Sequence, residues 1–238
     1  FEHVFCLSHG GKFSDKSFLE RSQQHGLKEI LFSLHGSTAE IHDKITRRKG
    51  SFDKIIKAIA NAHELGIVVR INCTVYEKNY DTLSSSLFNT LNPLEVNFIT
   101  LNYWDDAGGS VGDYTLVTNA IKRCIDDLTA KYINVRYTPY CYMIGYEKHV
   151  CNQYQHIYDI YDWNKGIYNK SAGTNIERSY NAAKVDRLKY YNKPKECLKC
   201  SHFNICDGIE NELDIPVHPI NGDRISDILY HRKEFYEI

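Results

Sequence analysis

The sequence lacks the features that mark several large classes of protein. Its 238 residues carry a formal net charge of -1, so there is no excess of positive charge with which to hold a nucleic-acid backbone. No apolar run approaches the roughly 20 residues that are needed to cross a bilayer. No signal peptide is visible either. We therefore expect a cytoplasmic protein that binds neither nucleic acid nor a membrane.

Methionine is also scarce. Met143 is the only one, and the chain starts with Phe1 inside what reads as a strand. A chain that begins in a buried strand is expected to have lost its first elements, by truncation or because the sequence is partial. The eight cysteines, placed in a reducing compartment, are expected to be core residues, metal ligands or redox groups rather than disulfides.

The segment from Leu27 to Thr74 reads as a βαβ unit. An apolar strand at 30–34 and a β-branched strand at 67–75 flank apolar residues at helical spacing. Gly66 is expected to end the helix in a left-handed cap. Ser37, with Glu40 three residues later, predicts a capping box for a short helix after the first strand.

Polar residues on these strands give the first indication of chemistry. Because side chains alternate along a strand, Ser33, His35, Arg70 and Asn72 share the face opposite the apolar set. A buried guanidinium needs a partner. For Arg70 that partner is either an Asp or Glu of the next strand or the carboxylate of a ligand, and the residues alone leave both open.

Strands and helices alternate about five times with short connections, which predicts a parallel α/β barrel or an open parallel sheet. Asp113 is a good N-cap for a helix at 114–131. Beyond Cys141 the apolar periodicity fades and the segment 137–191 is dense in tyrosine, which indicates a loop-rich lid. We therefore expect two domains, at 1–140 and 141–238.

Three cysteines near the C-terminus form a C-x2-C-x5-C pattern: Cys197, Cys200 and Cys206. Two thiolates separated by two residues can reach one metal, and backbone N–H groups of the turn neutralise sulfur charge. The local sequence offers no fourth cysteine, so Cys141 and Cys151 are the candidates. An iron-sulfur cluster and a structural zinc site are both compatible with this pattern.

At this point the chain resembles the radical S-adenosylmethionine (SAM) superfamily, in particular members with a C-terminal auxiliary-cluster domain of the SPASM or twitch type. The resemblance lies in SLHGSTAEIHDKI, GSFDKIIKAI and LGIVVRINCTV, in LSHGGKFSD, and in the C-x2-C-x5-C pattern. It implies a partial (β/α)6 barrel that covers the second to sixth strands, followed by a small extension with cysteine ligands.

The resemblance also implies cofactors, partners and site residues. SAM would be bound by Gly10, Ser33, Ser51, Arg70 and Asn72, although Ser51 also reads as a helix N-cap. An auxiliary [4Fe-4S] cluster would be bound by the cysteines. The substrate would be a peptide or protein, and flavodoxin or ferredoxin would donate electrons. His35, Asp105, Asp106 and the lid are expected near the substrate, without assigned roles.

One motif of that superfamily is absent from the 238 residues: the C-x3-C-x2-C spacing that binds the catalytic cluster. Either the segment has been cut away, or the chain is a degenerate, non-catalytic relative that serves as a scaffold with a structural zinc site. Truncation is the better explanation of the start of the chain, and the chain as given should not cleave SAM.

For the fourth ligand we expect Cys141 rather than Cys151. Cys141 follows the strand at 133–137 and Pro139 directly, so it is anchored at the rim of the sheet. Cys151 lies farther along in a polar segment. A rigid anchor lowers the entropy cost of ordering a metal site.

Overall fold

The computed structural model describes residues 4–100, 111–152, 155, 188–211 and 213–234. Contacts among these residues divide the chain into two compact units. The first ends at Asn134 and the second begins at Val135. The domain boundary expected from the sequence lies a few residues later, between 140 and 141. No helix in the described part of the chain combines the length and the apolar character that crossing a membrane requires.

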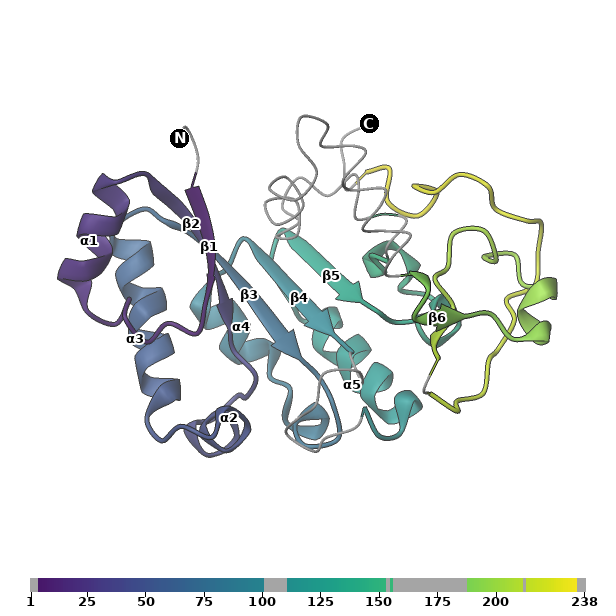
Figure 1. Ribbon diagram of the computed structural model, residues 1–238, viewed down its shortest axis with the longest axis horizontal. Helices are drawn as coiled ribbons and strands as arrows, with labels where there is room; N and C mark the ends of the chain where they lie inside the picture. The colour runs from purple at the N-terminus through teal and green to yellow at the C-terminus, as the bar shows by residue number, and fades with distance from the viewer. Residues whose placement is uncertain (1–3, 101–110, 153–154, 156–187, 212, 235–238) are drawn as a thin grey trace. The chain divides into compact units, whose positions relative to one another are not determined.

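The chain contains a five-stranded parallel sheet whose strands follow one another in chain order, and its last strand runs across the boundary at Asn134 (Figure 1). The strands are β1 (Val4–Ser8), β2 (Leu27–Ser33), β3 (Val68–Thr74), β4 (Glu95–Ile99) and β5 (Tyr132–Arg136). The helices between them are α1 (Lys16–Gln24), α2 (Ala39–Thr46), α3 (Ser51–Glu64), α4 (Ser85–Leu91) and α5 (Tyr114–Asp126). The predicted α/β class with a parallel sheet is confirmed.

The two faces of the sheet differ in character. Ile30, Ile71 and Phe98 are fully buried on one face, where the ring of Phe98 lies 5.9 Å from that of Phe88 on α4. Since side chains alternate along each strand, Arg70 and its partners belong to the opposite face. The helices thus pack on the apolar face, which leaves the polar side chains on the other.

Local sequence signals account for most helix ends. Gly66, with φ +66°, follows α3 in the left-handed conformation, and Asp113 caps α5 with hydrogen bonds from Thr115 and Leu116. Both predictions are confirmed, although α5 ends at Asp126 rather than at 131. The predicted capping box was wrong. The N-cap of α2 is Thr38, and the hydroxyl of Ser37 instead donates to the carbonyl oxygen of Thr82.

The second unit has little regular structure among its described residues. It contains the 3-10 helices η2 (Tyr140–Tyr142), η3 (Glu147–His149) and η4 (Lys195–Lys199), together with the antiparallel pair β6 (Tyr191–Asn192) and β7 (Ile209–Glu210). Another 3-10 helix, η1 (Tyr80–Thr82), belongs to the first unit. Most of the tyrosine-rich segment 137–191 falls in 156–187, outside the described residues.

Candidate functional site

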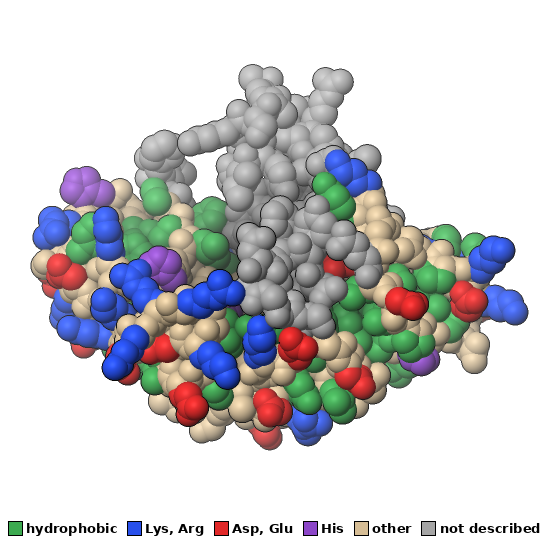
Figure 2. Space-filling view, turned by 60° about the horizontal axis from the view of Figure 1, so that its bottom comes forward, with side chains coloured by type: hydrophobic (Ala, Val, Ile, Leu, Met, Phe, Trp, Pro, Cys, Tyr) green, Lys and Arg blue, Asp and Glu red, His purple; other side chains and the backbone are tan. Residues whose placement is uncertain are grey.

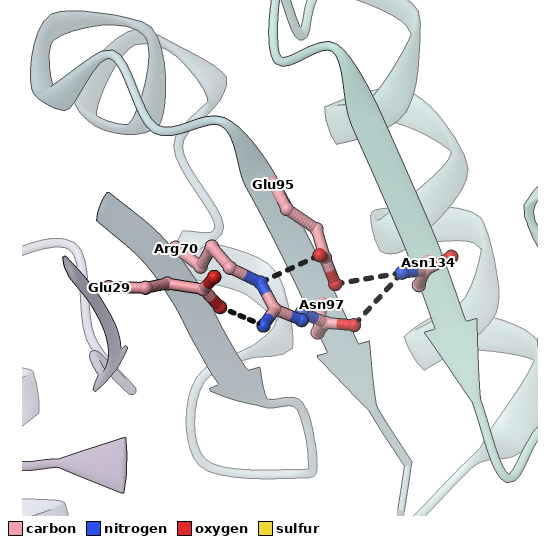
Figure 3. A network of polar contacts seen from close by, with 5 residues as sticks. All are labelled: Glu29, Arg70, Glu95, Asn97 and Asn134. Carbon is pink, nitrogen blue, oxygen red and sulfur yellow. Dashed lines mark hydrogen bonds and ion pairs between the residues drawn. The ribbon is translucent and has the colours of Figure 1, made fainter. Parts of the chain in front are cut away.

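A chain of hydrogen bonds crosses four strands on the polar face of the sheet (Figure 3). Arg70 on β3 donates from Nε to Oε2 of Glu95 on β4 at 2.8 Å, and from Nη1 to Oε1 of Glu29 on β2. The second oxygen of Glu95 accepts from Nδ2 of Asn134 on β5 at 2.8 Å, and Asn134 also donates to Asn97 at 3.1 Å. All five side chains are buried.

The two carboxylates keep Arg70 charged. Burial alone would lower the pKa of Arg70, but the charges of Glu95 and Glu29 raise it above its ordinary value. The side chain of Arg70 is 1% exposed, and those of Glu29 and Glu95 are 5% and 1% exposed. Removing one partner of such a buried pair costs about 3 to 5 kcal/mol, because it leaves an uncompensated charge.

This pairing decides between the two partners that the sequence left open for Arg70. The strand register places Arg70 on the same face as Ser33 and Asn72, as predicted, and its partner on the next strand is Glu95. With Glu29 as a second carboxylate, the guanidinium has no excess charge to offer a ligand carboxylate. Arg70 is therefore removed from the residues that we propose to bind SAM.

Ser33 and Asn72 lie opposite each other where β2 and β3 pair. Asn72 is 9% exposed, and its Oδ1 atom has no hydrogen-bond partner among the described residues. A buried carbonyl oxygen without a donor is costly unless something else supplies one. Within the described residues, the Oδ1 atom of Asn72 thus has an open acceptor position.

Gly10 has a structural role that the sequence did not reveal. Its φ is +78°, and a β-carbon at this position would lie 2.9 Å from Cα of Ile55 on α3. Only glycine fits both the left-handed conformation and the close approach to the helix. Any contact of Gly10 with SAM stays a prediction.

Ser51 does not cap α3, as one reading of the sequence had it. The N-cap is Gly50, and the hydroxyl of Ser51 donates to Oδ1 of Asp43 at 2.8 Å. The carboxylate of Asp43 also accepts the backbone N–H groups of Gly50 and Phe52, and the bond from Phe52 does most to hold the pKa of Asp43 below its ordinary value. The carboxylate of Asp43 therefore occupies the N-terminus of α3, where the carboxylate of SAM would otherwise bind. For this reason we also remove Ser51 from the proposed SAM ligands.

His35 joins the segments that follow β2 and β3. Its Nδ1 atom accepts the backbone N–H of Thr74 at 3.1 Å, and Asn79 donates to the carbonyl groups of His35 and Thr74 at 2.7 and 2.8 Å. Burial, together with the nearby His42, lowers the pKa of His35 to about 4. His35 is therefore neutral at pH 7. Asp105 and Asp106, which were also expected near the substrate, lie outside the described residues.

The candidate metal centre is a pocket of the second unit, which encloses about 380 Å³ including space open to solvent. Four cysteines line it: Cys141, Cys197, Cys200 and Cys206. Burial raises the pKa of Cys197, and the neighbouring groups Cys141 and Cys200 raise it further, because like charges close together disfavour the thiolate.

Backbone N–H groups point at the sulfur atoms. Ile220 donates to Sγ of Cys200 and Gly208 donates to Sγ of Cys206, each at 3.4 Å. Such bonds stabilise thiolates and are characteristic of sulfur ligands in metal centres. Burial raises the pKa of Cys206 to about 12, so without a cation this group stays a thiol. Four thiols that line one pocket, two of them with N–H donors, have the chemistry of metal-thiolate ligands.

Cys151 is not among the residues that line this pocket. Its side chain is fully buried, and its backbone N–H donates to the carbonyl of Val135 at 3.0 Å. In the first unit Cys73 and Cys124 are buried and Cys6 is half-buried. Burial raises the pKa of Cys6 to about 11 and that of Cys124 to about 12. Cys73 is fully buried, and burial raises its pKa most strongly.

Whether the four cysteines hold a metal stays a prediction. Among the described residues, no group of three or more Cys, His, Asp or Glu side chains is arranged to hold a metal ion.

Two other pocket residues were missed by the sequence reasoning. His202 and Lys193 line the pocket, and the ring of His202 stacks on that of His231 at 4.9 Å. The position of His202 two residues after Cys200 was the available signal.

No protein-family model matches the chain. Among curated proteins, the chain is similar to the antilisterial bacteriocin subtilosin biosynthesis protein AlbA of Bacillus subtilis (strain 168), with 31% identity over 109 residues. The aligned part is 45% of this chain and 24% of that protein. The chain thus spans about a quarter of the length of this relative.

Proposed function

We propose that the chain is part of a radical SAM enzyme that modifies a peptide or protein. The observation that carries the proposal is the pocket lined by Cys141, Cys197, Cys200 and Cys206, which follows a parallel α/β sheet in the chain. The strand order β1 to β5 is sequential, without the reversal that defines a doubly wound sheet. This order supports a partial (β/α)6 barrel as the finer description of the fold.

The four cysteines would hold an auxiliary [4Fe-4S] cluster. Cys197 and Cys200 would supply two thiolates from η4 and the residue after it. Cys141 in η2 would supply the third, and Cys206 the fourth. The N–H groups of Ile220 and Gly208 would spread the negative charge that thiolates carry.

When bound beside a reduced catalytic cluster, SAM would supply the radical chemistry that removes a hydrogen atom from the substrate. In this chain, Asn72 would accept a hydrogen bond from SAM at Oδ1, and the Ser33 hydroxyl opposite it would add a second polar contact. The 238 residues contain no C-x3-C-x2-C spacing, so we propose that the chain alone does not cleave SAM. An electron donor such as flavodoxin or ferredoxin would reduce the clusters.

A peptide or protein substrate is supported by the similarity to a bacteriocin biosynthesis protein. That match is partial, so the proposal names only the class of substrate. The bond that is modified stays open.

The metal content of the chain tests this proposal. Anaerobic purification, followed by reconstitution with iron and sulfide, should yield iron and sulfide in equal amounts and a paramagnetic signal after reduction. Cys141→Ala should lower both, whereas Cys151→Ala and Cys6→Ala, which remove thiols outside the pocket, should leave them unchanged.

Two outcomes would overturn the proposal. Zinc bound stoichiometrically, with iron excluded even under anaerobic conditions, would favour the scaffold protein with a structural zinc site. For the intact protein that carries the catalytic motif, SAM that binds without forming 5′-deoxyadenosine would rule out the catalytic function.

A further inference from the structure

A second pocket lies in the first unit, between α2 and the segment that follows β3. It has a volume of about 720 Å³ including space open to solvent, and it is lined by Glu40, Ile41, Lys44, Ile45, Arg47, Tyr76 and Lys78. None of these residues has a role in the sites described above.

The pocket stands where ligands usually bind in a parallel sheet. Its residues come from two connections that each follow the carboxyl end of a strand, α2 after β2 and Tyr76 and Lys78 after β3. The carboxyl edge is the part of such folds where binding residues collect. The position alone therefore favours a ligand over an incidental hollow.

Cations outnumber acids in the pocket. Lys44, Arg47 and Lys78 are exposed, and Glu40 is the one carboxylate among the lining residues. Asp43 does not neutralise Lys44 or Arg47, because its carboxylate is bound at the start of α3. In the space-filling view, Lys and Arg side chains gather over α2 and the start of α3 (Figure 2). In a chain with a net charge of -1, this is a local concentration of positive charge.

Arg47 lines the pocket in a backbone conformation that residues other than Gly and Asn seldom adopt. Arg47 is the C-cap of α2 in the left-handed conformation, with φ +55°, where Gly or Asn is the usual residue. A strained residue that carries a charge into a pocket is a reason to look for a ligand there.

The rest of the lining is apolar. Ile41 and Ile45 lie one helical turn apart on α2, and the ring of Tyr76 is 8% exposed with the ammonium of Lys78 5.7 Å from its centre. A free phosphate would use only the cations. An acidic side chain next to an apolar one would use both parts of the lining.

We propose that this pocket binds an acidic segment of a peptide. Carboxylates of the segment lie on Lys44 and Arg47, and a neighbouring apolar side chain packs on Ile41 and Ile45. This inference rests on the proposed function in one respect, since a peptide is taken as the substrate.

Fluorescence anisotropy of the 238-residue chain tests the inference with three labelled peptides. One carries several Glu residues and one Phe, the second has Gln in place of Glu, and the third has Ser in place of Phe. The first should bind tightest, and added salt should weaken its binding. Arg47→Gly should weaken binding at least fivefold while the unfolding midpoint does not fall, because glycine suits the left-handed position.

Arg48→Gln is the matched control, since Arg48 is exposed beside Arg47 but does not line the pocket. Equal binding of the Glu and Gln peptides, or an equal loss in Arg48→Gln, would overturn the inference. Full competition by inorganic phosphate, or no loss on replacing Phe, would show an anion site without preference for a peptide and would overturn it too. The assay involves neither metal nor SAM, so its failure is distinct from a failure of the proposed function.

Discussion

The Nε atom of Arg70 lies 2.8 Å from Oε2 of Glu95 on the neighbouring strand, and both side chains are 1% exposed. This ion pair links β3 to β4, while the bond from Arg70 to Glu29 links β3 to β2. Buried charges of this kind are a poor source of stability relative to an apolar core, but they penalise every register that separates them. The network therefore favours one alignment of the three strands.

Arg70→Met should destabilise the protein by about 3 to 5 kcal/mol, because it leaves the buried carboxylates of Glu29 and Glu95 without their cation. Urea unfolding at pH 7 measures this change. The triple variant Glu29→Gln, Glu95→Gln, Arg70→Met should recover part of the loss, since it removes all three charges together.

Lys16→Met is the control for this prediction. Lys16 pairs with Glu64 on the surface, where both side chains are about half exposed, so the change should be too small to detect. If Arg70→Met were as mild as Lys16→Met, the carboxylates would have to be solvated or protonated, and the account of the network would be wrong.

The face of Arg70 could be predicted from sequence, but its partners could not. Alternation along a strand is a local property, so Ser33, Arg70 and Asn72 could be assigned to one face without knowledge of other strands. The pairing with Glu29 and Glu95 depends on the register of three strands, which is a tertiary property. A single sequence contains no comparable signal for that register.

His35 should make stability depend on pH. Because the folded-state pKa of His35 is lowered from 6.5 to about 4, the unfolded chain binds more protons between these values. Stability should therefore fall as pH decreases from about 6.5 toward 4, by up to about 3 kcal/mol from this group. Urea unfolding at several pH values measures the slope.

His35→Asn keeps an acceptor for the N–H of Thr74 but removes the titrating group, so the slope should become shallower. It should not vanish, because burial also lowers the pKa of His42. An unchanged slope in His35→Asn would contradict the assignment.

Cys141 was preferred to Cys151 because it is anchored at a strand end. Proximity to a strand end singled out Cys141, and the structure places Cys141, without Cys151, among the residues that line the pocket with the other three cysteines. Backbone rigidity, which the sequence indicates through β5 and Pro139, was the reason for that choice, and metal binding by Cys141 stays a prediction. Such reasoning could not identify Asp43 at the start of α3, because that contact depends on the turn geometry between two helices.

Gly208→Ala should disturb the metal centre without removing a ligand. Gly208 has φ +100°, and a β-carbon there would lie 2.1 Å from the carbonyl oxygen of Asn192 on β6. The backbone must shift, and with it the N–H that Gly208 donates to Cys206. We expect lower iron content after reconstitution, measured against protein concentration.

Gly145→Ala is the matched control for this change. Gly145 also lies in the second unit with a positive φ of +84°, but a β-carbon there would meet no atom within 4 Å. It should cost only backbone strain, about 1 kcal/mol, and leave the iron content unchanged. Full iron content in Gly208→Ala would show that β6, β7 and the N–H donor do not support the centre.

Asn72→Leu should separate ligand binding from folding. The Oδ1 atom of Asn72 is buried without a donor among the described residues, so an apolar side chain of similar size should not lower stability. SAM should bind about 5- to 10-fold more weakly, as expected for one lost hydrogen bond of about 1 kcal/mol or slightly more. Calorimetric titration and urea unfolding measure the two effects.

Asn134→Leu provides the contrast, because it breaks bonds to Glu95 and Asn97 and should destabilise the fold. If Asn72→Leu destabilised the protein to the same extent, or left SAM affinity unchanged, Asn72 would be a structural residue of the sheet rather than a contact to SAM.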